Sequence, residues 1–283
     1  MSRVAYVNGR YVPLRDAMVH VEDRGYQLSD GVYDVSEVVD GRLIDEDRHW
    51  ARLAYSLGEL RIRPPMAESA LRLVVRELVR RNRIRHGLVY LQVTRGRAPR
   101  NHAFPAVPVP PSLVITARRA DPAAAARATS GIAVITVPET RWARVDIKTI
   151  GLLPNVLAKQ AAKEAGAAEA WFVDAHGIVN EGSSSNAWIV TRGGEVVTAP
   201  VTAPILRGVT RIAVIEIAAA LGIPVAERRF TLAEAHDARE AFITSTTTHV
   251  APVVVIDGVA VGDGAPGPIT IALREAFARR IAG

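Results

Sequence analysis

The chain has 283 residues, about half of them apolar, which suits one large or two medium domains with hydrophobic cores of their own. It carries a net charge of +6 and no cysteine, which excludes disulfides, thiolate metal sites and a cysteine nucleophile. The sequence contains no run of about 18 apolar residues, so no transmembrane helix is predicted. No signal peptide is visible. We therefore expect a cytoplasmic protein that does not bind membranes.

The first part of the chain predicts two hairpins followed by two amphipathic helices. Alternating residues surround Asn8-Gly9 and Asp40-Gly41, which are hairpin turn signals. Asp45 is expected to cap the first helix. The expected elements are strands 4–12 (a hairpin), 33–39 and 42–44, helices 45–60 and 67–82, strand 88–94, an extended proline-rich loop 104–112 and strand 113–117.

A second block follows an Ala-rich segment, 121–130, which is the best candidate for a domain linker between residues 1–120 and 131–283. The expected elements of this block are strands 132–137, 170–173, 187–190, 196–198, 241–244 and 253–256, and helices 155–165, 210–221 and 269–280. Many hairpins in a mixed order argue against a purely parallel, doubly wound sheet. The sequence predicts a mixed α/β (α+β) fold.

Lys148 is the first candidate for chemistry. It ends the segment 141–148, which we interpret as strand-like, and apolar residues flank it. Burying an ammonium group is costly, and a desolvated lysine is a better amine nucleophile. The alternative is a lysine with a structural role only.

Two further segments could bind a charged ligand. The run Glu181 to Asn186 combines a carboxylate with three serines, but it lacks the G-x-S-x-G frame of a hydrolase nucleophile; a polar surface turn is the alternative. Gly208 stands just before an apolar helix, whose free N–H groups could bind phosphate, unless it is an ordinary capped helix start. The hydroxyl-rich run 244–248 could add phosphate donors or merely solvate a turn.

Arg100 and His102 follow the strand expected at 88–94, in an extended loop that points both side chains the same way. An arginine beside a histidine suits a carboxylate, although a solvated loop is the alternative. The seven histidines lack ligand spacing, so we predict no metal site. The basic cluster 76–85 is interpreted as the solvated face of a helix, and we expect no nucleic-acid binding.

Taken in order along the chain, these signals resemble the fold-type IV, or class IV, aminotransferases, and among them the D-amino acid transaminases. The likeness covers nearly the whole chain. The stretches that carry it are Glu22-Asp23-Arg24-Gly25-Tyr26-Gln27, Asp30-Gly31-Val32-Tyr33, Pro99-Arg100-Asn101-His102, Asp146-Ile147-Lys148, Leu157-Ala158-Lys159-Gln160, Glu181 to Asn186 and Thr244-Ser245-Thr246-Thr247.

The resemblance implies a cofactor, pyridoxal 5'-phosphate (PLP), and a set of roles. Lys148 would form the Schiff base and move the substrate proton, and Glu181 would contact the pyridine nitrogen. The other residues placed at the cofactor are Arg52, Ser184, Leu206, Val209, Thr210 and Thr246. The residues placed at the substrate are Tyr33, Val35, Arg100, His102, Ser245 and Thr247.

The resemblance also implies an architecture and a partner. It predicts an N-terminal α/β sandwich and a C-terminal pseudo-barrel with the cofactor between them. In the family the arginine and histidine of the carboxylate-binding loop reach in from the partner subunit, so a homodimer is implied. The Arg-x-His pattern favours D-amino acids and their keto acids as substrates. Asn101 and Gly151 depart from the family pattern.

Three alternatives stay open at this point. An aminodeoxychorismate lyase or an (R)-selective amine transaminase would share the cofactor residues, but Arg100 and His102 would have little purpose there. A non-catalytic protein that binds nucleic acid or anions is the remote alternative, based on the high pI and the basic cluster 76–85.

Overall fold

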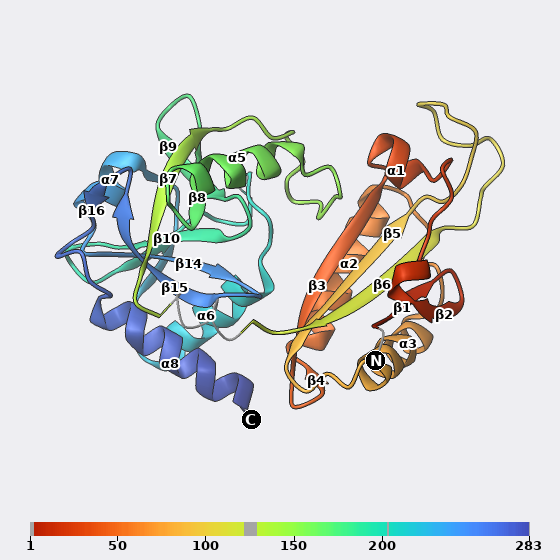
Figure 1. Ribbon diagram of the computed structural model, residues 1–283. Helices are drawn as coiled ribbons and strands as arrows, with labels where there is room; N and C mark the ends of the chain where they lie inside the picture. Colours follow the sequence, from red (N-terminus) through yellow and green to blue (C-terminus); the bar gives the residue numbers. More distant parts are fainter. Residues whose placement is uncertain (1–2, 122–128, 203, 283) are drawn as a thin grey trace. The chain divides into compact units, whose positions relative to one another are not determined.

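The computed structural model describes residues 3–121, 129–202 and 204–282 (Figure 1). The chain divides into two compact units, residues 1–120 with 147–151 and residues 121–146 with 152–283, and each unit has its own sheet. The predicted linker 121–130 lies mostly outside the described residues. The segment that carries Lys148 groups with the first unit, although we placed it in the second domain.

The first unit is an antiparallel sheet in the order β2-β1-β6-β5-β3-β4. Its strands are β1 (Val4–Val7), β2 (Arg10–Pro13), β3 (Gly31–Val39), β4 (Arg42–Leu43), β5 (Gly87–Thr94) and β6 (Ser112–Arg119). Its helices are the 3₁₀ turn η1 (Leu14–Asp16), α1 (Arg24–Leu28), α2 (Glu46–Glu59) and α3 (Glu68–Arg81). Both predicted hairpins are present, and both residues of each turn have positive φ, as type I′ turns require.

Alternation along β3 sorts the side chains of this sheet onto two faces. Val32 and Asp34 are buried on the face that α2 and α3 cover, whereas Tyr33 and Val35 lie on the opposite face and are partly exposed. The helix-covered face forms the core of the unit, with Trp50, Leu53, Leu57, Leu71, Val75, Leu78, Leu91, Val93 and Ile115 among its members.

The second unit is a mixed sheet in the order β12-β11-β10-β14-β15-β7-β8-β9-β13, with β16 paired to β15. Its strands are β7 (Ile132–Pro138), β8 (Glu169–Val173), β9 (Ile178–Gly182), β10 (Asn186–Val190), β11 (Val196–Thr198), β12 (Val225–Glu227), β13 (Phe230–Thr231), β14 (Glu240–Ser245), β15 (His249–Ile256) and β16 (Val259–Ala260). Its helices are α5 (Leu153–Glu164), α6 (Val209–Ala220), α7 (Leu232–Asp237) and α8 (Pro268–Ala282).

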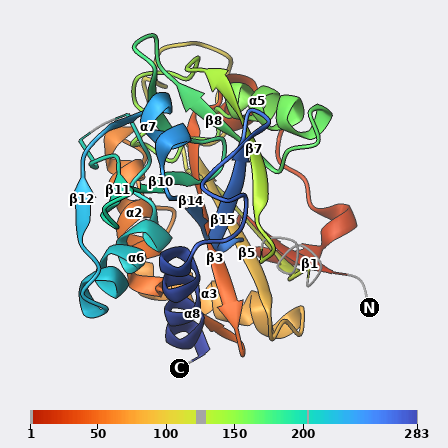
Figure 2. The ribbon, with the colours of Figure 1, turned by 90° about the vertical axis from the view of Figure 1, so that its left-hand side faces the viewer.

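This second sheet curls around its own side chains. Val197 from β11 and Phe230 from β13 stand near opposite ends of the strand order, yet both belong to one buried cluster with Trp171 and Ile243. A flat sheet would keep such residues far apart, so the sheet is a half-barrel. On its outer side α6 and α8 lie against each other and cover β14, and α5 covers β8 (Figure 2).

Several expectations differ from the structure. The segment 141–148 is irregular and contains no strand, and the isolated bridge of Thr149 with Val32 lies just after it. Asp45 precedes α2, but its side chain makes no capping hydrogen bond and its φ of 49° is left-handed. The strands β12, β13 and β16 and the helices α1 and α7 were not predicted, because they are too short to show a period, whereas β9 was missed because it shows no alternation.

Within residues 3–121, 129–202 and 204–282, no helix has the length and apolarity needed to cross a membrane. The same residues contain no group of three or more histidines and carboxylates placed to bind a metal ion. The basic residues of α3 are largely paired with acids, for example Arg80 and Arg81 with Glu77 at 2.7 Å. The basic cluster is therefore a neutralised helix face for much of its length.

Candidate active site

Lys148 lies beside the start of β3 in the first unit. Its carbonyl accepts the N–H of Tyr33 at 3.0 Å, and its own N–H donates to Ser56 Oγ at 3.2 Å. Its Nζ lies 4.3 Å from the centre of the Tyr33 ring, within cation–π range. Among the described residues no carboxylate pairs with this ammonium group. The amine is thus held against an aromatic face and not committed to an ion pair.

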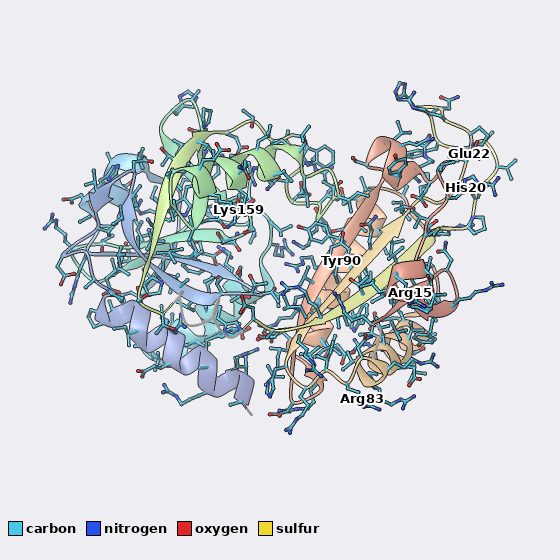
Figure 3. All side chains as sticks on the ribbon, in the orientation of Figure 1. Arg15, His20, Glu22, Arg83, Tyr90 and Lys159 are labelled. Atoms are coloured by element: carbon cyan, nitrogen blue, oxygen red, sulfur yellow. The ribbon has the colours of Figure 1, made fainter. Side chains whose placement is uncertain are left out.

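Tyr33 and Val35 share the sheet face next to Lys148. Tyr33 stacks on Tyr90, with 5.5 Å between ring centres, and Val35 pairs with Tyr90 across β3 and β5. Figure 3 marks Tyr90 on the first sheet. The Tyr90 hydroxyl donates to Gln92 Oε1 at 2.7 Å. Burial and the neighbouring Tyr33 raise the pKa of Tyr90 to about 12, so this phenol is neutral at physiological pH. The part of this face next to Lys148 is therefore aromatic.

Arg52, predicted to bind phosphate, reaches from α2 to the helix-covered face of the same sheet. Its Nε and Nη2 donate to the two oxygens of Asp34, each at 2.8 Å, and His49 Nδ1 lies 2.7 Å from Asp34 Oδ1. Burial raises the pKa of Asp34, but the charges and hydrogen bonds of Arg52 and His49 outweigh it and hold that pKa well below its usual range. Nε and Nη2 of this guanidinium are therefore bound and oriented by Asp34.

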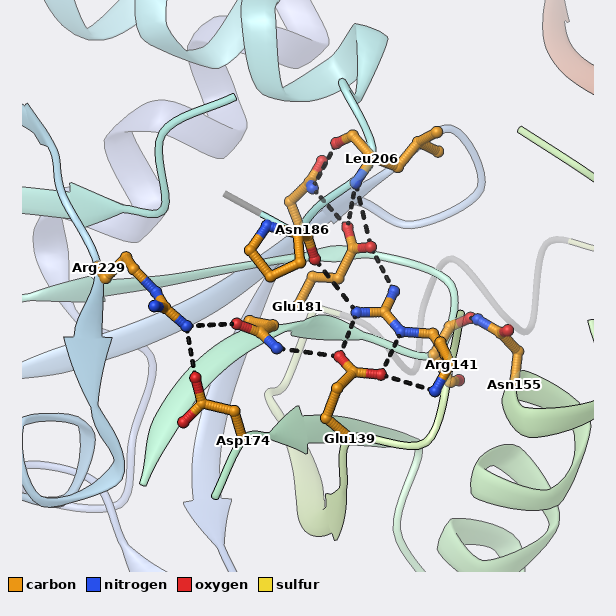
Figure 4. A network of polar contacts seen from close by, with 11 residues as sticks. Glu139, Arg141, Asn155, Asp174, Glu181, Asn186, Leu206 and Arg229 are labelled. Carbon is orange, nitrogen blue, oxygen red and sulfur yellow. Dashed lines mark hydrogen bonds and ion pairs between the residues drawn. The ribbon is translucent and has the colours of Figure 1, made fainter. Parts of the chain in front are cut away.

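Glu181 is the centre of a polar network in the second unit (Figure 4). The residue is only 4% exposed. Its carboxylate accepts hydrogen bonds from Arg141 Nη1 at 2.5 Å, from Asn186 Nδ2 at 2.9 Å and from the N–H of Leu206 at 3.0 and 3.1 Å. Donors of this kind favour the ionised form of a carboxyl group. Glu181 is therefore a negative charge of fixed orientation.

Arg141 joins Glu181 to a second acid, Glu139. Its Nη2 and Nε donate to the Glu139 carboxylate at 2.6 and 2.9 Å. Burial raises the pKa of Glu139, but hydrogen bonds and charge from Arg141 outweigh it, and the pKa is lowered. The two carboxylates and the one guanidinium of this triad together carry more negative than positive charge. A carboxylate in such a triad favours a cation beside it.

The network continues from Glu139 to the surface. Asn180 Nδ2 donates to Glu139 at 3.0 Å, and Asn180 Oδ1 accepts Arg229 Nη2 at 3.2 Å. Arg229 also pairs with Asp174 at 2.5 Å. Asn180 and Glu181 are neighbours on β9, so adjacent side chains of one strand both take part in this network.

Asn186 connects Glu181 to the start of α6. Its Nδ2 also donates to the carbonyl of Leu206 at 3.0 Å. Gly208 is the N-cap residue of α6, and a Cβ built on it would stand 2.0 Å from Asn186 Oδ1, so a larger residue would have to displace the Asn186 side chain. No side chain caps this helix. Its first N–H groups, at Val209 and Thr210, are suited to an anion.

The three serines after Gly182 are organised by a buried acid that the sequence did not reveal. Glu169 accepts the hydroxyls of Ser183, of Ser184 at 2.8 Å and of Ser185 at 3.1 Å. Lys159 Nζ lies 3.4 Å from the same carboxylate. Ser184, predicted at the cofactor, thus has its hydroxyl on Glu169, although the residue is exposed.

The other hydroxyl-rich run forms the turn after β14, as expected. Ser245 ends that strand, and Thr246 and Thr247 stand in the turn. Ser245 Oγ lies 2.8 Å from Thr248 Oγ1 and 3.2 Å from Thr247 Oγ1. These hydroxyls therefore bond to one another within a single turn.

Arg100 and His102 lie in the irregular loop after β5, and both residues are exposed. The backbone of this loop is bound by the buried Arg24, which reaches the carbonyls of Asn101 and His102. The predicted carboxylate-binding pair is thus presented outward on an anchored loop.

The structure brings the predicted residues together in groups. Lys148, Tyr33 and Val35 share one face of the first sheet, and Arg52 lies beneath its other face. Glu181, Leu206, Val209 and Thr210 share one network with the start of α6. The polar partners that sequence reasoning missed are Asp34, His49, Glu139, Arg141, Glu169 and Arg24. The one local signal for such a pairing was the short spacing of opposite charges, as between Glu139 and Arg141.

Comparison with known proteins identifies this arrangement. Residues 31–256 match the family model for class IV amino-transferases. The chain belongs to the class IV aminotransferases. This class IV aminotransferase is 42% identical over 274 residues to a D-alanine aminotransferase from Bacillus licheniformis, covering 97% of this chain and 95% of the relative. A D-alanine aminotransferase from Listeria innocua is 41% identical over 276 residues, with the same two coverages.

Solved structures of class IV enzymes share the fold. A branched-chain amino acid aminotransferase from Escherichia coli superposes with a TM-score of 0.91 at 25% identity, covering 99% of this chain and 94% of that one. A second branched-chain amino acid aminotransferase, from T.th. and with pyridoxamine 5'-phosphate, gives 0.91 at 28% identity, with coverages of 99% and 94%. The predicted fold-type IV architecture, an antiparallel sheet with a half-barrel sheet, is confirmed.

The cofactor of class IV aminotransferases is PLP, and the side chains of this chain match its functional groups. The amine of Lys148, which pairs with no carboxylate among the described residues, suits the aldehyde. The carboxylate of Glu181, held in a fixed orientation by Arg141, Asn186 and Leu206, suits a protonated ring nitrogen. The uncapped start of α6 suits the phosphate.

Proposed function

We propose that this protein transfers the amino group of D-amino acids, such as D-alanine, to an α-keto acid, such as 2-oxoglutarate, by a PLP-dependent ping-pong mechanism. The observation that carries the proposal is the likeness to D-alanine aminotransferases, about 40% identical over nearly the full length of both chains. Amino acids and keto acids are accordingly its substrates.

Lys148 is the proposed catalytic residue. When bound, PLP supplies an aldehyde that takes up the amino group and a ring that accepts electrons from the substrate Cα. Lys148 Nζ would hold the cofactor covalently and then move a proton at the substrate Cα. The Tyr33 ring beside Nζ and the backbone bonds on either side of the residue keep the amine in place.

Glu181 would keep the proton on the ring nitrogen of the cofactor. A carboxylate stabilises a neighbouring cation, and hydrogen bonds from Arg141 and Asn186 keep the Glu181 carboxylate ionised and aimed. Substitution of Glu181 by glutamine should therefore reduce turnover more than cofactor binding.

The phosphate would be bound by charge and by backbone donors. Arg52 would supply the charge, and Asp34 orients its guanidinium through Nε and Nη2. Val209 and Thr210 supply N–H groups at the start of α6. The remaining residues proposed at the cofactor, on the resemblance alone, are Ser184, Leu206 and Thr246.

The substrate carboxylate would be held by Tyr33, Arg100 and His102, because a guanidinium forms charged hydrogen bonds with a carboxylate and the other two side chains can add donors. We call Tyr33, Arg100 and His102 the carboxylate trap. The side of the substrate that faces Lys148 decides whether the D- or the L-amino acid reacts, and the trap would fix that side. Val35, Ser245 and Thr247 complete the proposed substrate residues.

A homodimer is part of the proposal, with Arg100 and His102 reaching the partner's site. In support, the first unit exposes large apolar side chains at Met18, Val21 and Tyr26, in and just before α1, and this segment bonds to the Arg100 loop through Arg24 and Glu22. Exposed apolar surface next to the carboxylate-binding loop would suit an interface. We also propose a cytoplasmic location, which suits a chain without cysteine and is tested by cell fractionation.

The test is the absorption spectrum of the purified holoprotein before and after D-alanine or L-alanine. We expect a visible band from lysine-bound cofactor, which D-alanine bleaches and L-alanine does not. Lys148→Ala should lack both the covalently bound band and turnover. Bleaching by L-alanine alone would refute the D-selectivity. A band that neither alanine bleaches would favour the aminodeoxychorismate lyase or (R)-amine transaminase reaction.

A further inference from the structure

Arg24 is a buried arginine that none of the proposed roles uses. It opens α1, and it is 2% exposed. Its Nε pairs with Asp30 Oδ2 at 2.7 Å. The other two nitrogens turn to the loop after β5, where Nη1 donates to the carbonyl of Asn101 at 2.6 Å and Nη2 to that of His102 at 3.4 Å. One guanidinium thus grips two consecutive peptide groups.

Arg95 anchors the far side of the same loop. It shares Asp30 with Arg24, at 2.7 and 2.9 Å, and it donates to the carbonyl of Leu60 at 2.7 Å. Its guanidinium lies 3.6 Å from the centre of the Phe104 ring, a close cation–π contact. The segment 101–104 is therefore attached by carbonyls at one end and by a ring at the other.

The charges of this cluster explain why it binds carbonyls. Two buried guanidinium groups share one carboxylate, Asp30, whose side chain is 11% exposed. Buried N–H donors without acceptors are costly. The loop carbonyls and that of Leu60 supply the acceptors that Asp30 cannot. The buried guanidinium of Arg24 therefore keeps its hydrogen bonds to the loop, and that of Arg95 its contact with Phe104, only while the loop holds this conformation.

We propose that Arg24 is a positioning residue for recognition of the substrate carboxylate. This inference rests on the proposed function, in which Arg100 and His102 bind that carboxylate. Fixing the peptide groups of Asn101 and His102 fixes the directions in which the two exposed side chains leave the backbone. Without these two hydrogen bonds, which anchor the loop, Arg100 and His102 would no longer stand at a defined separation. The loop would then have to become ordered when substrate binds, which weakens binding.

Lysine cannot replace this arginine. The substitution Arg24→Lys would keep the charge opposite Asp30, but a single ammonium group lacks the planar fork that reaches a carboxylate and two carbonyls at once. Arg97 provides the matched control, because it lies in the same loop, its side chain is 63% exposed and it makes one 3.4 Å contact with Glu22.

The experiment compares holoenzymes of the wild type, R24A, R24K, R97A and R100A. Steady-state kcat and KM are measured with D-alanine, and half-reaction rates with (R)-1-phenylethylamine, which lacks a carboxylate. R24A should raise the KM for D-alanine about tenfold or more with little change in kcat, in the cofactor spectrum or in the amine half-reaction. R24K should lie between R24A and the wild type, and R97A should match the wild type.

Two outcomes would overturn the inference. If R100A raises the KM for D-alanine but both R24A and R24K keep the wild-type KM, the anchor does not position the trap. If R24A loses activity equally with D-alanine and with the amine, Arg24 has a general structural role. If R24A does not fold, the same comparison is made with R24K. If R100A itself leaves the KM for D-alanine unchanged, the proposed carboxylate trap is refuted. That result differs from one that refutes only the positioning role of Arg24.

Discussion

Arg141 shows how one side chain can decide the state of two others. It stands between Glu139 and Glu181, each of which is largely or fully buried, and it donates to both. Replacing both partners of a buried ion pair can be nearly neutral, but removing one partner leaves an uncompensated buried charge. Arg141 serves two carboxylates, so its loss would strand both.

We predict that Arg141→Leu destabilises the protein by about 3–5 kcal/mol at neutral pH, measured by urea unfolding of the apoprotein. The control is Arg144→Leu, since Arg144 is half-exposed and pairs with Asp146 near the surface; its expected cost is about 0.2–1 kcal/mol. Equal effects of the two substitutions would contradict a buried charge triad.

The same substitution should have a pH signature. In the wild type Arg141 holds the pKa of Glu139 below its ordinary value. The ion pair therefore stabilises the fold fully above the unfolded pKa of glutamate, about 4.3, and this stabilisation is lost as pH falls through the lowered, folded value. The stability difference between wild type and Arg141→Leu should shrink below that pH. A difference that stays constant down to about pH 3 would contradict the assignment.

At the scale of elements, α6 is joined to Glu181 through one close contact. Its N-cap residue, Gly208, has an ordinary extended conformation with φ of −67°, so backbone strain does not require glycine there. The reason for glycine is the lack of space, because a Cβ would stand 2.0 Å from Asn186 Oδ1. Displacing Asn186 would disturb both Glu181 and the loop that leads to the helix start.

Gly208→Ala should therefore lower the affinity of the apoprotein for PLP about tenfold or more, measured by equilibrium dialysis. The matched control is Gly58→Ala, since a Cβ at this position in α2 meets nothing within 4 Å. Alanine is favoured over glycine inside helices by about 0.5–1 kcal/mol, so the control should keep PLP affinity and gain stability. Unchanged affinity in Gly208→Ala would show that Asn186 gives way without disturbing the site.

The elements that could be predicted from the sequence are those with a local physical cause. The turns at Asn8-Gly9 and Asp40-Gly41 need positive φ, which these residues tolerate. The start of α6 was predicted from Gly208 and the apolar run behind it. In contrast β9, which carries Glu181, has no alternating pattern because every residue from Val179 to Gly182 is buried.

Partners within the site could not be predicted in the same way. Arg141 and Glu181 are 40 residues apart, and strand pairings of β7, β8 and β9 bring them together. The same holds for Arg24 and the loop at Asn101, 77 residues away. The family resemblance supplied residue roles, but it did not reveal which side chains hold those residues in place.

At the scale of the whole molecule, the open question is which subunit completes each site. The proposed homodimer places Lys148 and Arg100 of one site in different subunits. A two-fold symmetric dimer then has two such mixed sites. The alternative is that each subunit supplies both residues to its own site. The two arrangements differ in a way that mixed dimers can reveal.

The decisive measurement mixes two inactive or impaired variants, Lys148→Ala and Arg100→Ala, and allows their subunits to exchange. If the carboxylate trap comes from the partner, each mixed dimer has one site with both native residues and one with neither. An equal, random mixture should then recover about a quarter of the wild-type activity at low D-alanine. If each subunit completes its own site, no mixed dimer has an intact site and the activity stays at the average of the two variants. Size-exclusion chromatography with a tagged variant verifies that exchange has occurred, so an absent recovery would count against the shared site and not against the mixing.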